Sequence, residues 1–213
     1  MIKIFVGTSQ NGEDDVAEKT LKYSLEKHTS EPLEIIFMRN KEDGFYGLFN
    51  FSGWATPFTN LRWAIPEYCG FSGRAIYMDV DQLNLKDISE LYNVDLKDKA
   101  LASRGNRLCV MVLDCEKMES LLDPVTVIKR TGNYGNLNYQ RLLSLSENID
   151  PRWNCLDGEG RDIEDIWHLH FTSMPTQPWK PSWYKGQHKQ HPRQDLVDLW
   201  TNYRDEALKN SNM

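Results

Sequence analysis

Hydrophobic runs of strand length alternate with helical patterns along most of the chain. The predicted strands are Ile2–Gly7, Leu33–Met38, Arg74–Met78, Asn106–Asp114 and Asp165–Phe171. The predicted helices are Asp14–Lys27, a segment around Arg62 that is interrupted near Pro66, Leu85–Tyr92, Cys115–Leu122 and Tyr134–Leu145. Alternation of this kind predicts an α/β layered fold, in which a mostly parallel central sheet is flanked by helices.

The C-terminal part of the chain carries one further helical pattern. Leu196, Trp200, Tyr203 and Ala207 share one stripe of a helix, so a helix within residues 190–213 is expected to pack on the body of the protein. A domain typically has about 100–200 residues. The sequence therefore predicts a single domain over residues 1–213.

Two segments have neither a strand period nor a helical period. Glu42–Pro57 is rich in glycine and aromatic residues, whereas Thr172–Pro192 is rich in proline. Long irregular loops in compact domains are often functional lids. For Glu42–Pro57 two interpretations stay open: the loop is a functional lid, or its aromatic side chains pack under the core.

Composition and charge exclude several classes of protein. The chain is 40% hydrophobic and 26% charged, as is typical of a globular protein. A net charge of −6 argues against nucleic acid as the partner, because phosphate contacts require clustered Lys and Arg. The sequence predicts no integral membrane segment and no signal peptide. The four cysteines form no C-x-x-C pair, which favours reduced thiols in a cytoplasmic protein.

The sequence Asp79-Val80-Asp81 provides the first candidate chemistry. Residues i and i+2 of a strand share a face and lie roughly 6.5 Å apart, so the two carboxylates are expected side by side. They repel each other unless a proton or a cation intervenes. Ligands of α/β sheets bind at the carboxyl ends of strands, and carboxylate oxygens suit Mg²⁺ or Mn²⁺. The alternative is a solvated turn in which Asp81 caps the following helix.

Two histidines of the last predicted strand provide the second candidate. His168 and His170 share one face by the same rule. A histidine in a strand is more often a hydrogen-bonded core residue than a ligand, and both interpretations stay open here. An imidazole beside two carboxylates favours Mn²⁺ over Mg²⁺.

Four segments together resemble glycosyltransferase family eight, the glycogenin and bacterial lipopolysaccharide galactosyltransferase-like enzymes of GT-A fold. They are "IFVGTSQNGEDDVAEKTLKYSL", "LRWAIPEYCGFSGRAIYMDVDQLNLKDISELYNVDL", "WNCLDG" and "HLHFTSMPTQPWKP". The match follows the family's order from about Ile2 to Pro181. The central D-x-D block is moderately specific, and the order of all four segments makes the resemblance strong.

The resemblance implies a ligand set for the metal and the donor. Asp79, Asp81 and His170 match the family's three metal ligands, and Val80 lies between the two carboxylates in the donor-binding segment. Arg62 matches the basic residue that contacts the donor. The implied cofactor is Mn²⁺ (or Mg²⁺), and the implied donor is a nucleotide sugar, in particular a UDP-sugar.

The resemblance places further residues around the donor. Thr8 and Ser9 fall where the first strand ends against the nucleotide base and ribose. Asn106 falls near the donor sugar. The family's "DQD" segment is not recognisable in "YGNLNYQRLL", where Gln140 is the nearest candidate. Gln177 stands where the family has a diphosphate-binding Lys, and Lys180 is the residue that could supply this charge instead.

The implied activity is metal-dependent sugar transfer with retention at the anomeric carbon, to an acceptor that is a saccharide, a lipid-linked molecule or a protein. Two alternatives stay open. A nucleotidyltransferase also uses strand-end carboxylates, although the acidic "GTSQNGEDD" replaces the Gly-rich basic loop that such an enzyme needs. A non-catalytic relative that binds sugars or nucleotides would not need the "DQD" segment.

Overall fold

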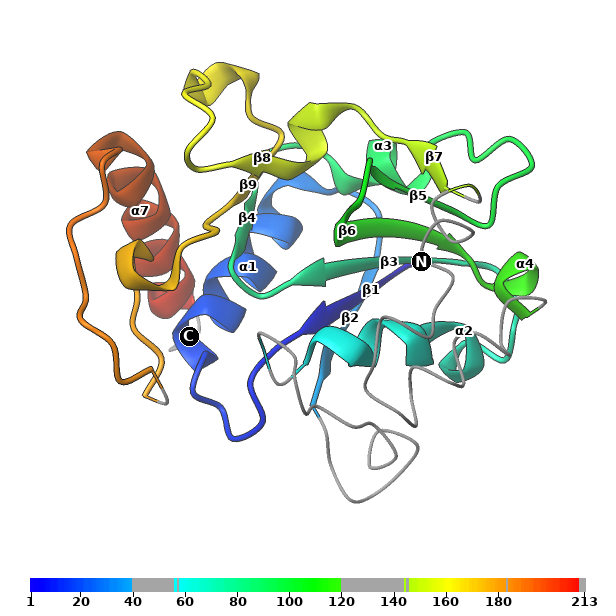
Figure 1. The fold of residues 1–213 in the computed structure, drawn as a ribbon, viewed down its shortest axis with the longest axis horizontal. Helices are drawn as coiled ribbons and strands as arrows, with labels where there is room; N and C mark the ends of the chain where they lie inside the picture. Colours follow the sequence, from blue (N-terminus) through cyan, green and yellow to red (C-terminus); the bar gives the residue numbers. More distant parts are fainter. Residues whose placement is uncertain (40–55, 57, 120–143, 145, 183, 211–213) are drawn as a thin grey trace.

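A computed structural model describes residues 1–39, 56, 58–119, 144, 146–182 and 184–210. This part of the chain forms a large sheet, a small sheet beside it, and helices around both (Figure 1). Most of the Glu42–Pro57 loop and nearly all of the helix predicted over Tyr134–Leu145, with Gln140, lie outside the described residues. The single-domain assignment stays a prediction.

The large sheet has six strands in the order β2-β1-β3-β6-β5-β7. Their bounds are β1 Ile2–Gly7, β2 Leu33–Met38, β3 Arg74–Asp79, β5 Leu101–Arg104, β6 Arg107–Asp114 and β7 Ser146–Asn148. The pairs β1–β2, β1–β3 and β5–β7 are parallel, and β6 runs antiparallel to both its neighbours. The predicted α/β architecture with a mostly parallel sheet is confirmed, while β5 and β7 were not predicted.

The small sheet has three short strands in the order β4-β9-β8. They are β4 (Gln82–Asn84), β8 (Cys155–Leu156) and β9 (His168–His170). The strand predicted over Asp165–Phe171 is therefore too long, because Ile163–Asp165 forms a 3₁₀ turn, η5. The partners of β9 are only two and three residues long, so the hydrogen-bonded ladder ends after three residues.

The helices largely follow the predicted segments. They are α1 (Asp15–His28), α2 (Ile65–Tyr68), α3 (Ile88–Tyr92), α4 (Cys115–Glu119) and α7 (Gln194–Asn210), with 3₁₀ helices η2 (Thr59–Ala64), η4 (Pro151–Asn154) and η6 (Met174–Thr176). Pro66 lies in the first turn of α2, where its missing N–H costs no hydrogen bond. The segment changes from the 3₁₀ helix η2 to the α-helix α2 at Ile65 and is not broken at Pro66, which corrects the prediction.

The cap of α3 decides one of the alternatives for the D-x-D segment. The Asp87 carboxylate accepts a hydrogen bond from the backbone N–H of Ser89 (2.9 Å) and caps α3. The interpretation in which Asp81 caps this helix is therefore wrong. The helix begins at Ile88, later than the predicted Leu85, because Asp87 is its N-cap.

The C-terminal helix packs as the sequence predicts. Figure 1 shows α7 alongside α1. Leu196, Trp200 and Ala207 are buried, and the Trp200 ring stacks on that of Trp179 with 5.1 Å between centroids. Among the described residues, no helix is both long and apolar enough to cross a membrane.

We expect Gly7→Ala to destabilise the protein. A Cβ at Gly7 would lie 2.3 Å from the Tyr77 Oη and 2.9 Å from Cδ2 of Phe58, and overpacking of this kind costs about 1–3 kcal/mol. Gly158→Ala is the control, because a Cβ there meets nothing within 4 Å. Urea unfolding measures both variants, and equal stabilities would contradict the close approach at Gly7.

The contact between α1 and α7 should weaken in acid. His28 Nε2 lies 2.6 Å from the Tyr203 hydroxyl, and burial, with the Lys27 charge, lowers the pKa of His28. The stabilisation that His28 provides is therefore complete above about pH 6.5, its pKa in the unfolded chain, and decreases as the pH falls below that value. The stability difference between wild type and His28→Gln should shrink between pH 8 and pH 5.5, as measured by urea unfolding. A constant difference would refute this.

Candidate functional site

The chain crosses from the large sheet to the small sheet at the D-x-D segment. Asp79 is the last residue of β3 and pairs with Gly7 of the parallel strand β1. The backbone N–H of Val80 donates to the Gly7 carbonyl (3.0 Å), and the Asp81 carbonyl accepts from the N–H of Phe171 (2.9 Å). The prediction that the two carboxylates share one strand is therefore wrong. The strand ends at Asp79, and the backbone bends at Val80.

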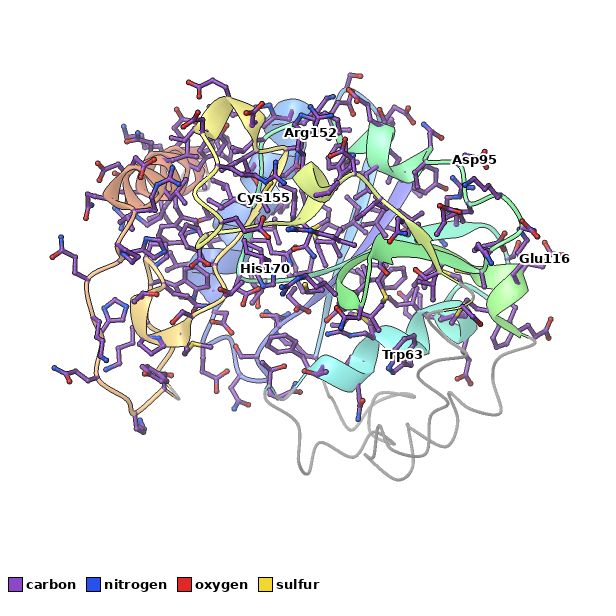
Figure 2. The ribbon with its side chains drawn as sticks, turned by 45° about the horizontal axis from the view of Figure 1, so that its top comes forward. Trp63, Asp95, Glu116, Arg152, Cys155 and His170 are labelled. Atoms are coloured by element: carbon purple, nitrogen blue, oxygen red, sulfur yellow. The ribbon has the colours of Figure 1, made fainter. Side chains whose placement is uncertain are left out.

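His170 faces the second carboxylate from strand β9. Its Nε2 lies 3.3 Å from Asp81 Oδ1, and its Nδ1 lies 3.1 Å from Oδ1 of the buried Asn154. Figure 2 shows His170 in the middle of the molecule, near Cys155 of the neighbouring strand β8. Burial opposes the charged imidazolium, but Asp81 and Cys109 beside it raise the pKa of His170 well above its usual value. The site therefore favours positive charge at Nε2.

Cys109 joins this group from strand β6. One potential donor atom each from Asp79, Cys109 and His170 lies within 4.8 Å of the other two. Sequence reasoning assigned Cys109 no role, because a thiol within an apolar strand carries no distinctive signal. Asn154, which was also missed, does have a signal, since it belongs to the "WNCLDG" segment of the family resemblance.

The Asp79 carboxylate is held by an aromatic hydroxyl and a guanidinium. Tyr77 donates to Asp79 Oδ1 (2.5 Å), and Nη2 of Arg62 lies 3.4 Å from the same atom. Arg62 also donates to the carbonyls of Leu108 (2.5 Å) and Thr59 (2.7 Å). Burial raises the pKa of Asp79, and Arg62 counteracts this. Arg62 thus lies beside Asp79, one of the predicted metal ligands.

The Asp81 carboxylate has one oxygen without a hydrogen bond. Its Oδ2 accepts from Nε2 of Gln177 (3.3 Å), which also donates to the Phe171 carbonyl (3.1 Å). Its Oδ1 is buried and has no hydrogen bond within the described part of the chain; only His170 Nε2 approaches it at ion-pair distance. Buried carboxylate oxygens without a hydrogen bond are rare and call for an explanation. A cation bound at this oxygen would provide that explanation. A donor set of carboxylates and an imidazole suits Mn²⁺.

Thr8 and Ser9 are buried directly after β1. The Thr8 hydroxyl donates to Glu18 (2.6 Å), and the Ser9 hydroxyl accepts from the backbone N–H of Asp14 (3.1 Å). The Asp14 carboxylate accepts from the indole N–H of Trp179 (3.1 Å). The proline-rich segment is therefore fastened to the β1–α1 loop.

The remaining predicted residues differ in their positions. Val80 is buried at the bend, whereas Asn106 is exposed in the turn between β5 and β6. Lys180 is exposed, and its ammonium lies 5.8 Å from the centre of the Tyr184 ring. The structure does not describe Gln140.

His168 is a core histidine. It is fully buried, and its Nε2 lies 2.7 Å from Oε1 of Gln82. Burial, together with the neighbouring His170, lowers the pKa of His168 to about 3. This supports the choice of His170 as the residue that faces the carboxylates.

Comparison with known proteins shows the fold. No protein-family model matches the sequence. Protein CDI of Arabidopsis thaliana is 26% identical over 242 residues, which cover 97% of this chain and 87% of CDI. The structure of the glycosyltransferase GlyE from Streptococcus pneumoniae TIGR4 is similar over 99% of this chain, with a TM-score of 0.64 and 15% identity.

This chain spans 64% of the GlyE chain. The galactosyltransferase LgtC, solved with donor and acceptor sugar analogs, is similar over 97% of this chain and 96% of its own, with a TM-score of 0.60 and 13% identity. At these identities the likeness establishes the architecture. The chain has the GT-A fold of these glycosyltransferases, as the sequence predicts.

Replacement of Arg62, whose guanidinium pairs with Asp79, should destabilise the protein. Arg62→Met leaves a carboxylate that is 14% exposed without its guanidinium, and breaking a buried ion pair costs about 3–5 kcal/mol. Arg204→Met is the control, because its pair with Asp205 is at the surface and contributes about 0–1 kcal/mol. Urea unfolding in the presence of a chelator measures both variants. Equal losses would show that Arg62 has no special role in stability.

Proposed function

We propose that this protein is a glycosyltransferase that transfers a sugar from a nucleotide sugar, with Mn²⁺ (or Mg²⁺) held by Asp79, Asp81 and His170. The observation that carries the proposal is the convergence of these three side chains at the carboxyl end of β3, with one buried Asp81 oxygen left without a hydrogen bond. Ligands bind at this edge of α/β sheets. The glycosyltransferases among the structural neighbours support sugar transfer as the reaction.

The donor set fits a divalent ion. The Asp81 Oδ1 and the His170 Nε2 face each other at 3.3 Å, and the Asn154 amide oxygen accepts from His170 Nδ1. That hydrogen bond keeps a proton on Nδ1, so that Nε2 can offer its lone pair once a cation replaces the second proton. When bound, the ion neutralises the negative charge that develops on the leaving diphosphate.

The surrounding residues position the ligands and the donor. Arg62 adds a fixed positive charge next to Asp79, where charge-assisted hydrogen bonds to phosphate are strong. Gln177 orients the Asp81 carboxylate. Thr8 and Ser9 border the base and ribose as fixed walls, because their hydroxyls are already bonded within the protein.

Several features of the proposal rest on the family resemblance. They are the uridine nucleotide, retention at the anomeric carbon, a diphosphate contact by Lys180, and support of the departing sugar by Gln140 and Asn106. No nucleophile is assigned. The acceptor is a saccharide, a lipid-linked molecule or a protein, and a cytoplasmic location stays a prediction.

Thermal unfolding with a panel of nucleotide sugars, each with and without Mn²⁺, tests this function. A ligand at about 100 times its Kd stabilises by roughly 2.7 kcal/mol, which raises the Tm of a domain of this size by about 5–10 °C. We expect a shift of this size that requires Mn²⁺ and favours one nucleotide sugar. Asp81→Asn should abolish it, because the ion loses a ligand.

Asp195→Asn is the matched control, since Asp195 pairs with Arg193 at the surface. It should retain the full shift. If no nucleotide sugar shifts the wild-type Tm, the transferase assignment fails and a binding relative without a donor is favoured. Release of pyrophosphate from a nucleoside triphosphate would instead identify a nucleotidyltransferase.

A further inference from the structure

We propose that Cys109 is a further metal ligand in this site, beside Asp79 and His170, and that its sulfur raises the affinity of the site for Zn²⁺ more than its affinity for Mn²⁺ or Mg²⁺. The inference shares with the proposed function only the premise that a divalent cation binds among these residues. It assigns to this chain a ligand set of mixed oxygen, nitrogen and sulfur donors.

The three donor atoms are close enough to share one ion. Each lies within 4.8 Å of the other two, and a point equidistant from three atoms at that spacing lies about 2.8 Å from each. Zinc binds sulfur at about 2.3 Å and nitrogen or oxygen at about 2.0–2.2 Å. A contraction of about 0.5–0.8 Å, which small side-chain rotations provide, completes the site and leaves a fourth position open.

Asn154 holds the side chains of Cys109 and His170 in place. Its amide Nδ2 donates to the Cys109 sulfur (3.2 Å), while its Oδ1 faces Nδ1 of His170 (3.1 Å). Asn154 is fully buried, so this bridge is not exchanged with water. Hydrogen bonds to the far side of metal ligands orient them, and their loss weakens metal binding by about 10–100-fold.

The backbone that carries Cys109 is fixed as well. Nε2 of Gln82 donates to the Cys109 carbonyl (2.9 Å), and Nη1 of Arg62 donates to the Leu108 carbonyl (2.5 Å). The start of β6 is thereby tied to β4 and η2. The sulfur is held at the metal position by three elements, without reliance on one flexible side chain.

Cys109 differs from a cysteine that only packs. The thiol of Cys155 is fully buried and donates to the carbonyls of Pro151 (3.6 Å) and Arg152 (3.4 Å). The Cys109 sulfur instead accepts an amide hydrogen bond and faces an imidazole and a carboxylate. The Cys109 sulfur therefore points at potential ligands, whereas the Cys155 thiol is directed at backbone carbonyls.

The donor types decide which ion is preferred. Carboxylates alone suit Mg²⁺ and Mn²⁺, whereas a thiolate with an imidazole suits Zn²⁺. Binding forms a zinc–sulfur bond and releases the thiol proton to the buffer. Sites of nitrogen and oxygen donors already bind Zn²⁺ more tightly than Mn²⁺, and the Cys109 sulfur is expected to increase this difference.

Co²⁺ replaces Zn²⁺ as a spectroscopic probe. It is added to the full chain, whose thiols are kept reduced by a reductant that is free of metal ions. We expect the wild type to show the sulfur-to-cobalt charge-transfer band in the near ultraviolet, and Zn²⁺ to remove it by displacement. Cys109→Ser should lose the band. It should also bind Zn²⁺ about 10–100-fold more weakly in a chelator competition, with a much smaller loss for Mn²⁺.

Cys69→Ser is the matched control, because Cys69 is partly exposed like Cys109 and lies outside the cluster. It should keep both the band and the Zn²⁺ affinity. Binding of Co²⁺ to the wild type without the band would overturn the inference even if Cys109→Ser failed to fold. Equal losses of Zn²⁺ and Mn²⁺ affinity in Cys109→Ser would overturn it as well.

The result is independent of the test of the proposed function. A wild type that shows the cobalt band but no Mn²⁺-dependent shift with nucleotide sugars supports the thiolate ligand and rejects the transferase. A wild type that shows the Mn²⁺-dependent Tm shift but no cobalt band supports the transferase and rejects the thiolate ligand. Failure of the wild type to bind Co²⁺ or Mn²⁺ at all would overturn the shared premise.

Discussion

The parallel pairing of β1 with β3 at Gly7 and Asp79 is the constraint on which the site depends. Gly7 leaves room for the Tyr77 hydroxyl, which in turn bonds Asp79. The Gly7 carbonyl then accepts from Val80 and turns the chain out of the large sheet. Because the next residues form β4, Asp81 is delivered to the edge of the small sheet, opposite the end of β9.

The electrostatics of the site follow from this junction. Asp79 and Asp81 are largely buried and repel each other, so each needs its own compensation. Asp79 receives it from Arg62 and Tyr77, and Asp81 receives it in part from Gln177 and His170. The oxygen that remains without a hydrogen bond marks the place where a cation completes the balance.

The rest of the fold supports the positions of these groups. Asn154 connects the small sheet to β6 through His170 and Cys109. Trp179 binds Asp14 through its indole N–H and stacks on Trp200 of α7. The C-terminal helix thereby holds the proline-rich segment, and with it Gln177, against the loop that follows β1.

Local patterns in the sequence were sufficient for most of the architecture. The apolar pattern is long enough to predict an element in the strands β1, β2, β3 and β6 and in the helices α1 and α7. The α/β class was therefore predictable. The short strands β4, β5, β7 and β8 were not, because two to four residues carry no measurable period. Their pairing is decided by partners that are distant in the sequence.

The sequence by itself predicted one candidate site of Asp79, Asp81, Arg62 and His170, since a strand-end motif identifies the two carboxylates and the family resemblance adds Arg62 and His170. Only the tertiary structure decided that His168 is a core residue, because its environment depends on Gln82 across the small sheet. It alone brought Cys109 and Asn154 into contact with His170. Such contacts join segments 45 and 16 residues apart, and no local pattern encodes a distance between them.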